Sequence, residues 1–218
     1  MTARKRTAIL ISGRGSNMQA LVQAARAPDF PAEIALVLSN RPEAQGLVFA
    51  KEQGIAAAAV DHKIHAGRED FENTMQVLLD LHRIELICLA GFMRLLTPAF
   101  VKRWEGRIIN IHPALLPAYR GLHAHERALA DGVKIHGCTV HFVVPAMDEG
   151  PIIAQAAVAV LDDDTPKTLA ARVLEQEHII YPAALARVAS GAVVIRGNRV
   201  ICQDNCTNLT ALRVPATK

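Results

Sequence analysis

The 218-residue sequence predicts a doubly wound α/β fold that ends in an antiparallel hairpin and a long helix. Short apolar, β-branched runs alternate with segments of helical period over residues 7–111. A glycine-rich loop follows the first run, and the second half of the chain sets two strand-like segments side by side before a long helical one. A content of 51% apolar and 21% charged residues is that of a folded globular protein and excludes a disordered chain.

In the first half, strands and helices alternate. Residues 7–12 (TAILIS) form a continuous apolar run, which is typical of a strand buried on both faces of a parallel sheet. Further strands are expected at residues 34–39, 57–60, 86–90 and 108–111, and helices at 18–26, 43–53 and 68–82. Helices of this length between strands indicate right-handed crossovers and a Rossmann-like, mostly parallel sheet. Because ligands of such sheets bind outside the carboxyl ends of the strands, the loops at 12–17, 39–41, 91–96 and 110–113 should lie near one another.

The second half changes character. Residues 137–144 and 151–160 are close enough in sequence to form an antiparallel hairpin across 145–150. Thr165 and Pro166 then supply an N-cap and a proline in the first turn of a helix that runs to about residue 189. A small hairpin is expected from residues 192–195 and 199–201, around Gly197-Asn198.

Charge, hydropathy and cysteine content exclude several classes of protein. The 24 basic and 21 acidic residues leave a net charge of +3, which is too small for a surface that coats nucleic acid. The longest apolar stretches, 86–93 and 152–161, fall short of the ~20 residues of a membrane span. Four scattered cysteines do not form a disulfide framework, and the Cys202/Cys206 pair has no second pair to complete a zinc site. We therefore expect a reduced, cytoplasmic protein with small-molecule partners and no metal; no particular oligomeric state is predicted.

The loop GRGSN, residues 13–17, follows a strand and opens a helix, so its backbone N–H groups can hold an anion. Met18 stands where a dinucleotide motif has its third glycine, and the lysine of a nucleotide-binding P-loop is missing. The pattern therefore favours a single phosphate held by Gly15, Ser16 and Asn17, with a plain tight turn as the alternative.

Asn110 and His112 end a buried strand and project to the same side of it. An amide can stabilise the oxyanion of an acyl-transfer intermediate, while an imidazole handles protons. Asp148, on the turn MDEG, is the natural carboxylate to support His112. Three unrelated structural polar residues are the alternative. The sequence has no G-x-S-x-G nucleophile elbow, which favours direct attack by a substrate amine over a covalent intermediate.

The histidines cluster, since five of the nine lie within 30 residues. No cysteine joins His123 and His125 at a zinc-type spacing, so hydrogen bonding is the preferred interpretation over metal catalysis. We expect His123, His125 and His141 to line or support the site around His112.

The motifs ISGRGSN, LAGFMRLL, INIHPALLPAYRGLHAH, GCTVHFV, DEGPII and ARVLEQEHIIYP, taken in this order, resemble the phosphoribosylglycinamide formyltransferase family over residues 7–201. The resemblance implies transfer of a formyl group from 10-formyltetrahydrofolate to the amine of glycinamide ribonucleotide, in de novo purine biosynthesis. It implies one formyltransferase domain over 1–218, with a ribonucleotide-binding half at 7–112, a folate-binding and catalytic half at 113–201, and a tail at 208–218 that we expect to be disordered.

The resemblance also assigns residues. It implies catalytic roles for Asn110, His112 and Asp148. It adds Glu177, which alone would read as a solvated helix acid, to Gly15, Ser16 and Asn17 in the ribonucleotide site. The residues implied to contact the folate are Arg68, Met93, Arg94, Leu95, Leu96, Asn110, Val144, Pro145, Ala146, Met147 and Asp148.

Two departures from the family pattern and three alternatives stay open. Residues 144–147 carry less charge than expected, and Arg120 stands where proline or lysine is expected in many members. Formyltetrahydrofolate deformylase would use the same three residues with water as the acceptor, but it carries an additional N-terminal domain. Methionyl-tRNA formyltransferase carries a C-terminal RNA-binding domain. A non-catalytic folate- or nucleotide-binding module on the same scaffold is the third alternative.

Overall fold

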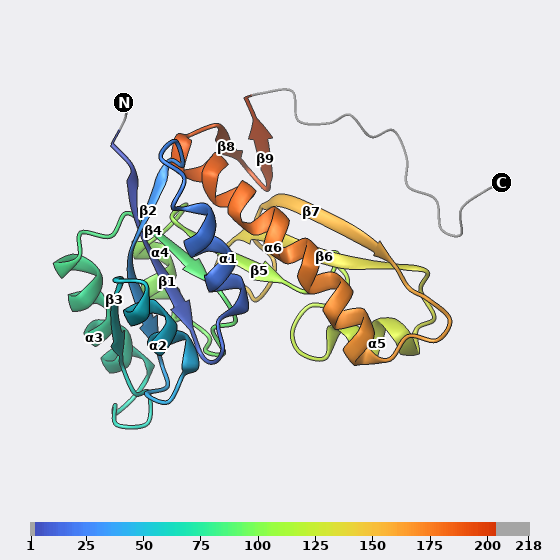
Figure 1. Cartoon of the computed structure of the whole chain (residues 1–218), viewed down its shortest axis with the longest axis horizontal. Helices are drawn as coiled ribbons and strands as arrows, with labels where there is room; N and C mark the ends of the chain where they lie inside the picture. The colour runs from blue at the N-terminus through green and yellow to red at the C-terminus, as the bar shows by residue number, and fades with distance from the viewer. Residues whose placement is uncertain (1–2, 204–218) are drawn as a thin grey trace.

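The computed structural model describes residues 3–203 of the chain; Cys206 and the predicted tail at 208–218 lie outside this range. Seven strands form one sheet in the order β3-β2-β1-β4-β5-β6-β7 (Figure 1). They are β1 (Lys5–Ile11), β2 (Ala32–Ser39), β3 (Ala56–Ala59), β4 (Leu86–Leu89), β5 (Ile108–His112), β6 (Ile135–Phe142) and β7 (Ile152–Ala159). The helices are α1 (Ser16–Ala24), α2 (Gln45–Glu52), α3 (Arg68–Leu81), α4 (Pro98–Arg103), α5 (Ala124–Ala130) and α6 (Pro166–Ser190).

The predicted fold class is confirmed. Neighbouring strands from β3 to β5 pair in parallel, and β6 and β7 add the expected antiparallel hairpin to the same sheet. The second predicted hairpin is also present, as β8 (Val193–Arg196) and β9 (Arg199–Cys202) joined by Gly197 and Asn198. Thr165 caps α6 as expected, with its side chain accepting from the Thr168 N–H.

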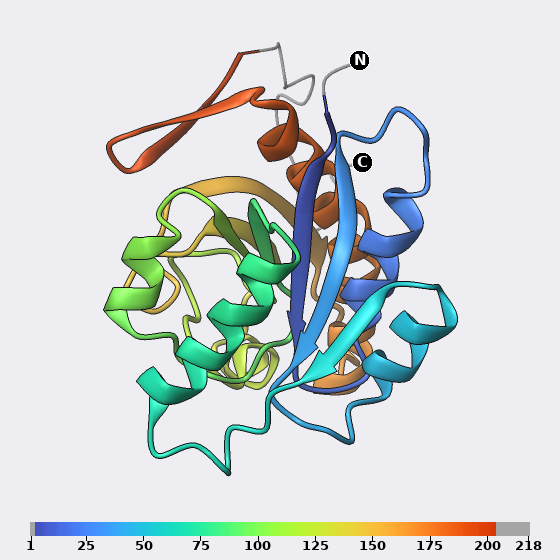
Figure 2. The same ribbon diagram turned by 90° about the vertical axis from the view of Figure 1, so that its left-hand side faces the viewer.

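Two apolar layers flank the sheet because successive strand residues point to opposite faces. Ile9 and Ile11 of β1 face the layer that contains α1, α2 and α6, whereas Ala8 and Leu10 face α3 and α4. Figure 2 views the sheet from the β3 side, with α3 on one face and α1 and α2 on the other. This is the doubly wound arrangement, and it places the helix starts of α1 and α3 at the same edge of the sheet.

The structure differs from the predicted elements in three places. β1 begins at Lys5, two residues earlier than predicted, because Lys5 and Arg6 already pair in register with Ala32 and Glu33 of β2. α4 and α5, of six and seven residues, are not predicted since they are too short to establish a helical period.

The ends of the parallel strands meet as expected. The strand order reverses between β1 and β4, which is where ligands bind in such sheets. Ser12, just after β1, accepts a hydrogen bond from the Met93 N–H at 2.8 Å and donates to the Asn40 side chain after β2. Three of the four predicted loops are therefore joined by one hydroxyl group. Within residues 3–203, no helix is both long and apolar enough to cross a membrane.

Candidate active site

His112 ends β5, and both of its ring nitrogens have partners. Nε2 lies 2.9 Å from the Tyr119 carbonyl oxygen and Nδ1 lies 3.4 Å from Asp148 Oδ2. A carbonyl can only accept, so Nε2 carries a proton and donates it to Tyr119. Nδ1 is the nitrogen that faces the Asp148 carboxylate. The predicted His112–Asp148 pair is thus formed, with side chains only 7% and 10% exposed.

Asp148 is held by the backbone around it. It adopts a left-handed conformation (φ 55°) on the loop between β6 and β7, and its Oδ2 accepts the Gly121 N–H at 2.9 Å. Two residues on, Gly150 passes so close to β6 that an added Cβ would lie 1.7 Å from the Phe142 carbonyl oxygen. Only glycine fits there, and this close approach brings the loop back against the strand that faces His112.

Asn110 lies beside His141 on the adjacent strand β6, and the two residues are register partners. Asn110 Nδ2 is 3.2 Å from His141 Nε2, while His141 Nδ1 is 2.8 Å from the Phe142 carbonyl oxygen. Nδ1 therefore donates to the carbonyl and Nε2 accepts from the amide. Burial lowers the pKa of His141, which keeps the ring neutral and able to accept. One amide hydrogen of Asn110 is thus fixed on His141 and the other is directed elsewhere.

The glycine-rich loop forms the start of α1. Gly15 is the N-cap with φ 74°, no side chain caps the helix, and its first turn contains no acidic residue. The first N–H groups of a helix have no intrahelical acceptor, so they are available to an anion. The loop is packed against α2, where the Gly46 N–H donates to the Gly13 carbonyl at 3.1 Å.

Glu177 of α6 lies against this loop and is 6% exposed, so the interpretation as a solvated helix acid is wrong. Its Oε2 accepts from Asn17 Nδ2 at 2.7 Å. Burial raises the pKa of the Glu177 carboxyl, and the hydrogen bond from Asn17 opposes this shift. Asn17 Oδ1 is buried and has no partner among the described residues. The pair therefore presents acceptor oxygens that a ligand with N–H or O–H groups would satisfy.

The residues implied to contact folate fall into three segments. Met93 and Leu95, in the loop after β4, are 61% and 60% exposed, whereas Arg94 and Leu96 are half-buried. Large exposed apolar side chains at the end of a central strand are typical of a surface that receives an apolar ligand. Residues 144–148 form the loop that ends at Asp148, with Pro145, Ala146 and Met147 exposed. Arg68 is the first residue of α3 and is exposed.

The remaining histidines hold no metal cluster: residues 3–203 contain no group of three histidine, cysteine, aspartate or glutamate side chains that could bind one. The rings of His125 and His136 pack edge to face with centroids 5.2 Å apart. Burial lowers the pKa of His136 to about 4 and also lowers that of His125, so both are neutral near pH 7. His123 is an exposed N-cap residue of α5.

Comparison with known proteins decides the family. Residues 5–185 match the formyl transferase family (Formyl_trans_N). The chain belongs to this family. Its relatives include phosphoribosylglycinamide formyltransferase of Escherichia coli K12. The two are 41% identical over 190 residues, which cover 87% of this chain and 90% of that protein. The chain is also 48% identical over 201 residues to trifunctional purine biosynthetic protein adenosine-3 of Gallus gallus; these cover 92% of this chain but only 20% of that relative, so the chain spans about a fifth of its length.

Solved structures of family members agree. Glycinamide ribonucleotide transformylase 1 of Symbiobacterium toebii superposes with a TM-score of 0.91 and 44% identity, covering 94% of this chain and 96% of that one. A formyltetrahydrofolate deformylase of Pseudomonas syringae pv. tomato has a TM-score of 0.85 at 24% identity, covering 92% of this chain and 66% of that one, which shows a shared fold alone.

Several contacts in the candidate active site could not be predicted from the sequence. The Tyr119 carbonyl and the Gly121 N–H are backbone groups, which every residue carries, so nothing marks them before the loop is folded. The Ser12 hydroxyl could have been noticed, because a polar residue directly after a buried strand commonly bonds a neighbouring loop.

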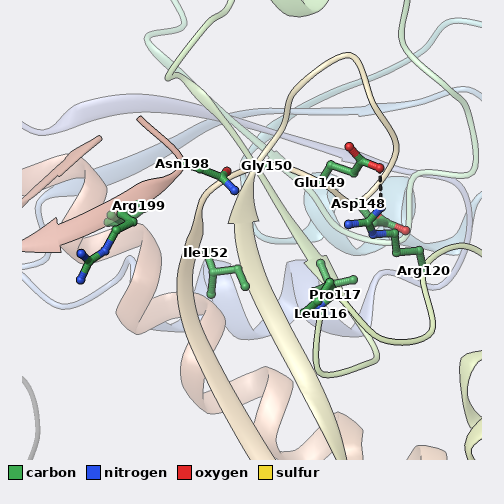
Figure 3. Close-up of a pocket in the computed structure, with 10 residues that line it drawn as sticks. Leu116, Pro117, Arg120, Asp148, Glu149, Gly150, Ile152, Asn198 and Arg199 are labelled. Carbon is green, nitrogen blue, oxygen red and sulfur yellow. Dashed lines mark hydrogen bonds and ion pairs between the residues drawn. The ribbon is translucent and has the colours of Figure 1, made fainter. Parts of the chain in front are cut away.

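A cavity of about 330 Å³ lies next to Asp148 (Figure 3). It is lined by Leu116, Pro117, Arg120, Asp148, Glu149, Gly150, Ile152, Asn198, Arg199 and Val200.

Proposed function

We propose that this chain transfers a formyl group from 10-formyltetrahydrofolate to the primary amine of glycinamide ribonucleotide, as a step of de novo purine biosynthesis. The observation that carries the proposal is the grouping of Asn110, His112 and Asp148 at the end of β5, on the sheet edge where α1 also begins. Membership of the formyl transferase family supports the same chemistry.

The ribonucleotide phosphate binds at the start of α1, where Gly15, Ser16 and Asn17 offer uncapped backbone N–H groups. The sugar hydroxyls or the amine then donate to Glu177 and to the otherwise unpartnered Asn17 Oδ1. The donor and acceptor types of this corner thus match the two ends of a phosphosugar.

The folate co-substrate, which brings the formyl carbon, binds between the loop after β4 and the loop before Asp148. Met93, Leu95 and Met147 are exposed apolar side chains that suit the flat face of a pterin or an aromatic ring. Arg94 and Arg68 are basic residues suited to the carboxylates of a folate tail. The Ser12–Met93 hydrogen bond holds the first of these loops in place.

The chemistry belongs to the three residues at β5. Positioning the amine against the formyl carbon makes the attack effectively intramolecular. Asn110 donates its second amide hydrogen to the oxygen that becomes negative. Next to that oxygen, His112 Nδ1 and Asp148 form a pair through which a proton can pass. As the bond from the amine nitrogen to the formyl carbon forms, the bond from that carbon to the folate nitrogen breaks, and the proton that the amine loses passes to the leaving folate nitrogen. Residues 7–112 thus hold most of the ribonucleotide site, while 113–201 supply Asp148 and the loop that covers the folate.

The test is an assay of formyl transfer by the whole chain, with and without glycinamide ribonucleotide. We expect tetrahydrofolate and formylated ribonucleotide to appear in equal amounts only when the ribonucleotide is present. Release of formate at the same rate without the ribonucleotide would identify a hydrolase instead. Binding of both ligands without turnover would identify a binding module.

A further inference from the structure

Tyr119 and Gly121, which flank Arg120 in the segment 119–121, each contact one member of the candidate catalytic pair. The Tyr119 carbonyl accepts from His112 Nε2 at 2.9 Å, and two residues later the Gly121 N–H donates to Asp148 Oδ2 at 2.9 Å. One short segment therefore sets both the proton position on His112 and the orientation of the carboxylate that faces it.

This segment holds a conformation that its own sequence does not favour. Tyr119 has φ 55° and Gly121 has φ 78°, and a left-handed tyrosine is uncommon. Such a conformation persists only where surrounding contacts fix it. One of these contacts comes from α5, because Arg127 Nη1 donates to the Arg120 carbonyl at 2.7 Å and its guanidinium lies 5.5 Å from the centre of the Tyr119 ring.

The second contact joins the segment to the Asp148 loop itself. Arg120 forms an ion pair with Glu149, the residue directly after Asp148, and Figure 3 shows this pair beside Asp148. Asp148, directly before Glu149, also has a positive φ, so a left-handed residue lies next to each partner of the ion pair. The ion pair and the Gly121–Asp148 hydrogen bond both join the segment 119–121 to the loop that contains Asp148.

We propose that Arg120 and Glu149 are positioning residues for the formyl transfer reaction. Their ion pair keeps the Tyr119 carbonyl on His112 and the Gly121 N–H on Asp148, so that the imidazole ring and the carboxylate stay aligned. The proposal rests on the proposed function, since it concerns the same three catalytic groups.

The experiment compares Glu149→Gln with Glu33→Gln. Both glutamates are 47% exposed at the side chain and pair with an arginine, but the Arg6–Glu33 pair lies at the opposite end of the sheet. We expect Glu149→Gln to lower kcat about three- to fivefold, as suits a partly exposed ion pair, with the KM for the ribonucleotide unchanged. Glu33→Gln should leave kcat unchanged. The charge-swapped double variant Arg120→Glu/Glu149→Arg should recover most of the lost rate.

A second readout needs no substrate. The ¹⁵N resonances of the His112 ring, measured by NMR, should shift in Glu149→Gln, return in the double variant and stay constant in Glu33→Gln. If the wild-type chain shows no formyl transfer, the proposed function fails while the NMR result still decides the positioning role. An unchanged kcat with unchanged His112 resonances, a failure of the charge swap to restore either, or a faster kcat in Glu149→Gln would overturn the proposal.

Discussion

At the carboxyl end of β1, the candidate ligand-binding groups lie on helices. At the end of β5, by contrast, the positions of the candidate catalytic groups depend on loops. The phosphate corner, where we propose that the ribonucleotide phosphate binds, consists of the first turn of α1 and the Glu177 side chain of α6. The catalytic corner instead joins β5 to residues 119–121 and 148–149, where three residues have positive φ. Under the proposed function, the ribonucleotide is therefore bound by helical elements, whereas the groups around His112 are positioned by two loops that are joined to each other.

The largest effect is expected from Asp148→Asn. The change keeps the shape and still accepts from the Gly121 N–H, but it removes the negative charge beside His112 Nδ1. We expect kcat to fall by about 10³ with little change in KM, as suits loss of acid–base support. Steady-state kinetics check this, with the exposed Asp162→Asn as control. An unchanged kcat would remove Asp148 from the chemistry.

Asn110→Ala should lower kcat by about 10²–10³, the usual cost of removing one oxyanion donor. One of its amide hydrogens is held by His141, so only the other is available to the reacting oxygen. Kinetics at saturating folate and ribonucleotide measure it, and a fall of less than fivefold would show that Asn110 does not contact the reacting oxygen.

A smaller and different effect is expected at the other corner. Asn17→Ala should raise the KM for the ribonucleotide about tenfold, through loss of one ligand contact, while kcat stays near the wild-type value. Ser16→Ala, which keeps the backbone N–H, is the matched control and should change KM less. An unchanged KM in both variants would place the ligand contact on the backbone alone.

The smallest effect concerns stability. Burial raises the pKa of Glu177 above its ordinary value of 4.5, so the folded state disfavours the ionised form. Its contribution to the free energy of unfolding is therefore complete below pH 4.5 and is lost as the pH rises through the raised folded pKa. Glu177→Gln should stabilise the protein by on the order of 1 kcal/mol near pH 8 and by nothing near pH 4, at a cost in ribonucleotide affinity. Calorimetry at the two pH values checks the sign, which a stabilisation that grows at low pH would contradict.

The same contrast explains what the sequence could predict. The strand at 7–12, the helix opened by GRGSN and the hairpin at 137–160 follow from hydrophobic period and helix-start signals, and the structure confirms them within a few residues. That Asn110 and His112 lie on the same side of β5 follows from the alternation of side chains along a strand. The burial of Glu177 does not, because which face of α6 is covered depends on its packing against α1. The Tyr119 carbonyl and the Arg120–Glu149 pair depend on how two loops meet, which no local pattern specifies.

The central claim is that the corner at β1 binds the ribonucleotide and the corner at β5 carries out the chemistry. It is tested most directly by single-turnover kinetics on Asn17→Ala and Asp148→Asn at increasing ribonucleotide concentration. We expect Asn17→Ala to reach the wild-type rate of formyl transfer once the ribonucleotide saturates, and Asp148→Asn to stay slow at every concentration. If Asn17→Ala stays slow at saturation, or if Asp148→Asn regains the wild-type rate, binding and chemistry are not divided between β1 and β5 as described.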